Sequence, residues 1–206
     1  MPSNTPAMST TTTTPPIFSS VRKLDLRRPE LREAIPAAIE ELGRGLLGTQ
    51  LQLALDTVVE RFRREEYDLT RVPAKRAIEF LQGGRWVAED LDDRYIGERL
   101  AGAMWVVAII CEPRRYPFFI AKPIGDALED LARDVEDEQI QKGLTSAIFG
   151  MRLDDLDRAH EAIGATLELV RTAEPDEHKR TDYRRLEGAL WIVELMCATK
   201  PEGAIG

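Results

Sequence analysis

Apolar residues recur at every third or fourth position through most of the chain. The first such run contains Leu31, Ile35, Ile39, Leu42 and Leu46. This spacing places the apolar side chains on one face of an α-helix, because an α-helix has about 3.6 residues per turn. No stretch alternates between apolar and polar residues for long enough to predict a strand of ordinary length. The pattern therefore predicts an all-α protein.

Glycine and proline mark where several of these helices begin and end. Pro29 is expected at the first position of the first helix, and Gly48 interrupts the run that follows. Pro73 predicts the start of a later helix, which Gly83 and Gly84 end. By the same spacing, further helices are expected over residues 51–62, 73–81, 92–111, 124–149, 154–173 and 182–198.

Two segments of the chain resemble each other closely. Residues 99–111 read RLAGAMWVVAIIC and residues 185–197 read RLEGALWIVELMC, with seven of thirteen positions identical. The identities pair Trp105 with Trp191 and Cys111 with Cys197, in a chain that has only 3 tryptophans and 2 cysteines. Shorter matches precede them in the same order, with residues 50–55 and 78–81 each matching a segment 89 positions later. This order of matches indicates a tandem duplication of a unit of about 85 residues.

The duplication sets the expected domain boundaries. Residues 27–112 and 113–198 would each form a unit of about four helices. The two units would then be stacked as a short helical-repeat array or joined as two fused bundles. Residues 1–26 open with an uncharged stretch rich in Ser, Thr and Pro, which predicts a disordered tail and lead-in. Residues 199–206 are expected to form a C-terminal tail.

Differences between the two copies indicate which helical faces are covered. Ala101 and Ala108 of the first copy correspond to Glu187 and Glu194 of the second, seven residues apart in both copies. Because burial of unpaired carboxylates is very costly, this face is expected to be exposed to solvent in the last helix. A stack that ends in the second copy is therefore favoured over a closed arrangement. The residues expected to pack between the units are Ala101, Gly102, Trp105, Ala108 and Trp191.

Charge is distributed unevenly along the chain. The net charge is −8, but residues 21–85 contain 13 basic and 11 acidic residues, whereas residues 86–206 contain 15 basic and 25 acidic residues. The acidic second half would repel a phosphate backbone, which disfavours nucleic-acid binding there.

Composition narrows the setting in which the protein is expected to work. The longest apolar stretch, residues 100–111, is far shorter than the ~20 residues of a membrane span, so no membrane association is expected. Two cysteines do not make a disulfide framework, and a cytoplasmic location is expected. The excess of 22 arginines over 6 lysines favours a bacterial source with a GC-rich genome.

No motif for catalysis or for cofactor binding stands out. The two histidines are His160 and His178, and only His160 has the carboxylate three residues before it that a di-iron half-site needs. Cys111 and Cys197 each end an apolar run, where a small buried side chain is expected. The sequence therefore assigns no catalytic residue, no cofactor and no metal.

Two aromatic segments break the symmetry between the copies. One surrounds Trp86, and the other lies at the junction between the copies. Aromatic and arginine side chains are frequent anchors of protein interfaces, although these could instead fill the crevice between the units. The candidate partner contacts are Arg85, Trp86, Arg114, Arg115, Tyr116, Phe118 and Phe119.

Three functional hypotheses follow from these features. The favoured one is a non-enzymatic scaffold or adaptor that presents a helical surface to another protein. The alternative is a small subunit of a nucleoprotein assembly that contacts nucleic acid through basic residues of the first unit, although interleaved acidic residues argue against it. A third is an enzyme with an unfamiliar metal-dependent site. The basic residues of the alternative are Arg61, Arg63, Arg64, Arg71, Lys75, Arg76 and Arg85.

Overall fold

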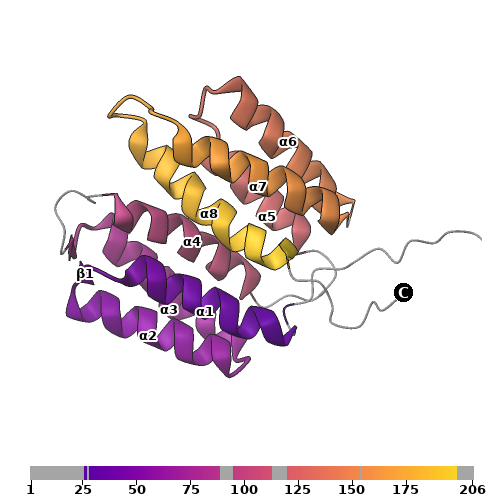
Figure 1. Ribbon diagram of the computed structural model, residues 1–206. Coiled ribbons are helices and arrows are strands. Elements are labelled where there is room, and N and C mark those ends of the chain that lie inside the picture. The colour runs from indigo at the N-terminus through magenta and orange to yellow at the C-terminus, as the bar shows by residue number, and fades with distance from the viewer. Residues whose placement is uncertain (1–25, 27, 89–94, 113–119, 154, 199–206) are drawn as a thin grey trace, which may run out of the picture.

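The computed structural model describes residues 26, 28–88, 95–112, 120–153 and 155–198. Over this part of the chain the protein consists of helices, short loops and one pair of two-residue strands (Figure 1). The all-α prediction is therefore confirmed. In chain order the elements are α1 (Pro29–Gly43), β1 (Leu46–Leu47), α2 (Thr49–Arg63), α3 (Tyr67–Gln82), β2 (Val87–Ala88), α4 (Ile96–Ile110), α5 (Ala121–Leu131), α6 (Glu138–Arg152), α7 (Leu156–Thr172) and α8 (Arg180–Ala198).

The predicted tails fall almost entirely outside the described residues. Residues 1–25 and 199–206 are not described. Leu26, which the sequence placed in the lead-in, is buried, and its carbonyl accepts a hydrogen bond of 2.9 Å from the Tyr67 hydroxyl. No helix within the described ranges combines the length and the apolar character that crossing a membrane requires.

Helices α4 and α8 lie side by side at the centre of the molecule and form its most extensive helix contact (Figure 1). Helices α1, α2 and α3 lie on the α4 side of this central pair, and α5, α6 and α7 lie on the α8 side. In each group the helices pack in sequence order, from α1 to α4 and from α5 to α8. Helix α1 also contacts both α4 and α8, and so does α5.

Three predicted helix boundaries are wrong. The first helical run was expected to include Leu46, but α1 ends at Gly43 and Leu46 lies in β1. The helix expected over residues 124–149 is divided into α5 and α6, because the Asp137 side chain caps α6 by accepting hydrogen bonds from the backbone N–H groups of Gln139 and Ile140. The helix expected to start at Pro73 starts at Tyr67 instead. Proline is tolerated inside α3 because a side chain from α2 satisfies the backbone carbonyl that Pro73 leaves unpaired, as described below.

The short strands join two loops of the first half. Leu46 pairs with Ala88 and Leu47 with Val87 in antiparallel register, which ties the α1–α2 connection to the segment after α3. The Gln52 side chain donates a 2.6 Å hydrogen bond to the Leu46 carbonyl. A two-residue strand produces no alternation that the sequence pattern could have revealed.

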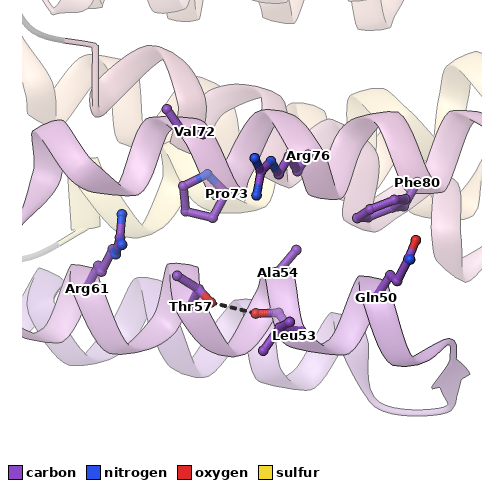
Figure 2. A pocket seen from close by; sticks show the side chains of 9 residues that line it. All are labelled: Gln50, Leu53, Ala54, Thr57, Arg61, Val72, Pro73, Arg76 and Phe80. Carbon is purple, nitrogen blue, oxygen red and sulfur yellow. Dashed lines mark hydrogen bonds between the residues drawn. The ribbon is translucent and has the colours of Figure 1, made fainter.

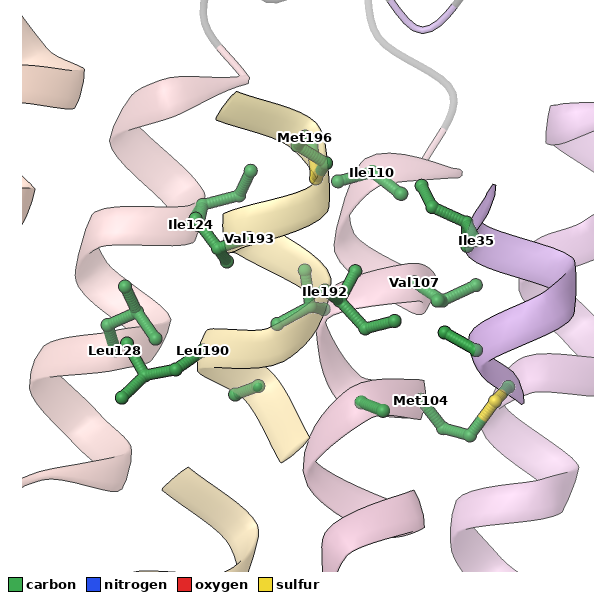
Figure 3. Close-up of a cluster of buried hydrophobic side chains, with 14 of the residues drawn as sticks. Ile35, Met104, Val107, Ile110, Ile124, Leu128, Leu190, Ile192, Val193 and Met196 are labelled. Atoms are coloured by element: carbon green, nitrogen blue, oxygen red, sulfur yellow. The ribbon is translucent and has the colours of Figure 1, made fainter. Parts of the chain in front are cut away.

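The hydrophobic core is continuous across both groups of helices. One cluster of buried side chains extends from α1 through α4 and α8 to α5. Figure 3 shows Ile35 of α1 and Val107 of α4 on one side of α8, and Ile124 and Leu128 of α5 on the other. Because α8 lies between these groups, its apolar residues contribute to both.

Glu187 corrects the prediction of an exposed face on the last helix. It is buried, with 6% of its surface exposed, and its carboxylate forms ion pairs with Arg99, Arg171 and Arg184 at 3.3, 3.7 and 2.8 Å. The prediction was wrong because it assumed an unpaired carboxylate, and these arginines supply the compensating charge. Since α8 packs against α4 in the interior, it does not form the polar end of a stack.

Helices α4 and α8 approach closely where two glycines meet the opposite backbone. A Cβ added at Gly102 would lie 1.9 Å from the Arg185 carbonyl oxygen, and one added at Gly188 would lie 1.8 Å from the Arg99 carbonyl oxygen. No side chain fits at either distance. Glycine is therefore required at both positions for this crossing to form.

Candidate functional site

The described residues bring together few groups suited to catalysis. No three His, Cys, Asp or Glu side chains gather within the described part of the chain in a way that could hold a metal ion. Cys111 and Cys197 are both buried, and burial together with the nearby Asp68 carboxylate raises the pKa of the Cys111 thiol to about 12. At neutral pH this thiol is protonated and therefore a poor nucleophile.

An open, largely apolar groove lies between α2 and α3 and has a volume of about 410 Å³ (Figure 2). Its lining residues form one stripe on each helix, spaced by three or four positions. Leu53 and Val72 on its edges are 68% and 57% exposed, and exposed apolar side chains that lie together are typical of an interaction site. We call this feature the α2/α3 groove; its lining residues are Gln50, Leu53, Ala54, Thr57, Arg61, Val72, Pro73, Arg76 and Phe80.

Pro73 fixes one charged side chain of the α2/α3 groove. Proline has no N–H, so the Leu69 carbonyl, four residues earlier, has no helical hydrogen-bond donor. The Arg61 guanidinium on α2 donates a 2.6 Å hydrogen bond to this carbonyl. The contact holds Arg61 across one end of the groove while Phe80 and Gln50 lie at the other end (Figure 2).

The α2/α3 groove is positively charged although the whole chain is acidic. Arg61 and Arg76 line it, and no carboxylate does. Neither arginine forms an ion pair with any other described residue. Arg85 adds a third positive charge beside the groove, with its guanidinium carbon 6.0 Å from the centre of the Phe80 ring. A ligand of opposite charge would therefore meet arginines that no neighbouring carboxylate neutralises.

Other arginines of the first half are paired with carboxylates. Arg63 contacts Glu40 at 2.8 Å and Glu33 at 3.4 Å, and the hydrogen bond with Glu40 holds the pKa of Arg63 above its ordinary value. Arg64 pairs with Glu60 and Arg71 pairs with Glu112, each at 2.6 Å. These ion pairs neutralise Arg63, Arg64 and Arg71, whereas Arg61 and Arg76 of the α2/α3 groove form no such pair with a described residue.

A second groove lies on the opposite side of α3, facing α4, and has a volume of about 380 Å³. Trp105 and Ala108, which the sequence placed between the two units, both line it. Residues of α3 and α4 line this groove, so Trp105, which is 37% exposed, lies between two helices of the first half rather than between the halves. The Arg71–Glu112 ion pair crosses this groove.

The remaining residues expected between the units occupy different surroundings. Gly102 lies at the crossing of α4 with α8, and Ala101 is buried on the same helix. Trp191 is partly buried and packs against the core.

Of the candidate partner contacts, Arg85 and Trp86 lie in the described part of the chain. Arg85 is exposed beside the α2/α3 groove. Trp86 is partly buried, its indole N–H donates a 2.9 Å hydrogen bond to the Leu81 carbonyl, and its ring covers Gly97 at the start of α4. Trp86 therefore serves packing within the first half. Arg114, Arg115, Tyr116, Phe118 and Phe119 lie outside the described residues.

Sequence reasoning missed Leu53, Val72 and Phe80 as parts of a surface site. A signal for Leu53 was present, because Leu53 lies off the face that carries Leu51 and Leu55. An apolar residue outside the buried stripe of an amphipathic helix is a candidate for contact with another molecule. Nothing in the sequence indicated that α2 and α3 would place these residues beside one another.

Comparisons of this chain with protein-family models, with curated proteins and with solved structures find no match. The function is therefore inferred from the residues of the chain itself.

Proposed function

We propose that this protein is a non-enzymatic interaction module that binds another protein through the α2/α3 groove. The observation that carries the proposal is the exposure of large apolar side chains, Leu53 and Val72, at the edges of an open groove. Water covers these side chains in the free chain, and a partner that covers them gains the free energy of apolar burial. Apolar contacts beside arginines are typical of protein interfaces.

The ion pairs of the first half support a protein partner over nucleic acid. Nucleic-acid binding without base recognition depends on many lysines and arginines that are free to neutralise phosphates. Arg63, Arg64 and Arg71 are each paired with a carboxylate, and such pairs would have to be broken before they could contact a phosphate backbone. Apart from Phe80, the apolar side chains that line the α2/α3 groove are aliphatic, whereas single-stranded nucleic acids stack on aromatic ones.

Site-specific photo-crosslinking tests the proposal. The full chain would carry a benzophenone amino acid at Leu53 and, as a matched control, at Leu153, an exposed leucine (55%) at the end of α6. Both proteins would be expressed in the source cell, irradiated and analysed by mass spectrometry. We expect one protein partner to be crosslinked from position 53 and not from position 153. Equal products at both positions, or none from position 53, would contradict a docking role for this groove.

We also propose that the two halves arose by tandem duplication. Helix contacts are reciprocal: α1 contacts α8 as α5 contacts α4, and the order of packing is the same in both groups. Gly102 contacts Arg185 and Gly188 contacts Arg99, and the two glycines, like the two arginines, are 86 positions apart in the sequence. Such reciprocity is what an approximate two-fold axis between two copies produces. Superposition of α1–α4 on α5–α8 in an experimental structure would test this origin.

A further inference from the structure

We infer that the partner segment held in the α2/α3 groove is an acidic amphipathic helix of about three turns. This inference rests on the proposed docking function and specifies the chemistry of the ligand. It follows from three properties of the groove: its length, its apolar lining and its unneutralised arginines. Binding of an amphipathic helix in a groove between two helices is a common mode of peptide recognition.

The length of the groove suits a short helix. Along α2 the lining residues run from Gln50 to Arg61, eleven positions apart. At about 1.5 Å per residue this corresponds to roughly 16 Å, or three helical turns. The floor consists of Ala54 and Pro73, both of them buried, with Leu53 and Val72 on the edges. A helix with apolar residues at spacings of three and four would cover these four side chains with one face.

The charges of the groove select an acidic helix. Arg61 is held at one end by the Leu69 carbonyl, and Arg76 lies between the ends on α3. Acidic residues occur on the same two helices, but they do not line the groove: Glu60 pairs with Arg64 at 2.6 Å, and Asp56 and Glu79 are exposed. Carboxylates beside the apolar face of the ligand would therefore form charge-assisted hydrogen bonds with both arginines.

The second half of the chain provides an internal comparison. Its helices α6 and α7 correspond to α2 and α3, but they pack closely and leave no equivalent space at the matching position. When the two copies are aligned, Ala54 of the first copy corresponds to Gly143 of the second, and Arg61 corresponds to Gly150. A Cβ at Gly150 would lie 2.9 Å from the backbone nitrogen of Ala159, so α6 meets α7 at backbone distance there. At the equivalent place in the first half stands an arginine side chain. We therefore assign the ligand site to the first half.

A panel of synthetic peptides tests the inference. Three lactam-bridged helices of equal length would be labelled with a fluorophore, since unbridged peptides this short are marginally helical. The first carries one leucine face flanked by glutamates, the second has lysines in place of the glutamates, and the third has the glutamates with the leucine positions scrambled. We expect the first to bind the full chain most tightly by fluorescence anisotropy. Its binding should weaken between about 50 mM and about 500 mM salt.

Matched variants locate the binding site. Arg76→Glu should weaken binding of the acidic peptide about tenfold, the equivalent of about 1.4 kcal/mol. Lys75→Glu changes the net charge equally, but Lys75 lines the other groove, so it should change binding less than twofold. Leu53→Asp should abolish binding, and Leu53 is 68% exposed, so the variant should keep its helical circular dichroism.

The outcomes separate this inference from the proposed function. Equal binding of the basic peptide, equal effects of Arg76→Glu and Lys75→Glu, or binding of none of the peptides would overturn the acidic-helix inference. Self-association of the full chain that Leu53→Asp abolishes would also overturn it, by placing a second copy in the groove. In each case a partner crosslinked specifically from position 53 would still support the docking function. Absence of that crosslink would contradict both.

Discussion

Glu187 shows how one residue can reverse a prediction based on its type. Its side chain is 7% exposed, and the arginines that contact it come from α4, α7 and α8. A second ion pair beside it, of 2.7 Å, joins Arg185 of α8 to Glu98 of α4. Removing a buried carboxylate from such a cluster leaves its arginines close to one another without compensating charge. Glu187 therefore holds charged groups of both halves together.

Replacement of Glu187 tests this role at the residue scale. We expect Glu187→Ala to lower the free energy of unfolding by about 2 kcal/mol, because three arginines lose a shared partner. The control is Glu168→Ala, which removes an exposed carboxylate that pairs with Arg171 and should cost less than about 1 kcal/mol. Urea denaturation followed by circular dichroism measures both. Equal losses in the two variants would mean that the Glu187 cluster contributes no more than a surface ion pair.

At the scale of elements, the crossing of α4 and α8 determines how the two halves meet. Each helix presents glycine to the backbone of the other, so the helices touch without an intervening side chain at these points. Larger apolar residues further along both helices, including Val107 and Ile192, then pack into the shared core. Close contact at the glycines and side-chain packing beyond them together fix the relative position of the halves.

Gly102→Ala tests the crossing. The new Cβ would lie 1.9 Å from the Arg185 carbonyl, and a backbone atom cannot move aside, so we expect a loss of about 1–3 kcal/mol of stability from overpacking. Gly164→Ala is the matched control within a helix. Its Cβ would lie 3.4 Å from the flexible end of Glu194, and the change should raise stability by up to about 1 kcal/mol. The pair would be compared by thermal and urea unfolding. If Gly102→Ala is neutral, the helices do not cross this closely.

The whole molecule combines one hydrophobic core, shared by both halves, with an uneven distribution of charge on its surface. The buried cluster joins helices of both halves, so neither half buries its apolar side chains alone. The net charge of the chain is −8, yet the α2/α3 groove is lined by two arginines and no carboxylate. A shared core predicts cooperative unfolding, and the uneven charge predicts that partners are selected at one place on the surface.

Tryptophan fluorescence tests cooperativity at this scale. Trp86 and Trp105 lie in the first half and Trp191 lies in the second. A Trp191→Phe variant would report on the first half, and a Trp86→Phe, Trp105→Phe variant would report on the second. Within each variant, we expect the fluorescence midpoint in urea to coincide with the midpoint by circular dichroism, because one core supports both halves. A fluorescence transition that clearly precedes the circular dichroism transition in either variant would show that the halves unfold separately.

The sequence by itself determined the helices and much of the buried set. Leu31, Ile35 and Ile39 recur at helical spacing, and all are fully buried on α1. Periodicity is a local property, so it can be read without knowing what each helix packs against. The same local signals gave a wrong helix start at Pro73, because proline was taken as the first residue of the helix. Arg61 of another helix donates the hydrogen bond that Pro73 cannot, so the helix continues through this residue.

Only the tertiary structure decided which faces are covered and where the candidate site lies. Glu187 can be buried because Arg99 and Arg171 of other helices, together with Arg184 of its own helix, compensate its charge. Trp105 is exposed because α3 and α4 leave a groove beside it. The α2/α3 groove likewise needs Leu53 and Val72 to be brought to one surface by two helices. The physical reason is common to all three cases: burial and charge compensation depend on neighbours in space, whereas the spacing of apolar residues that predicts a helix depends on neighbours in sequence.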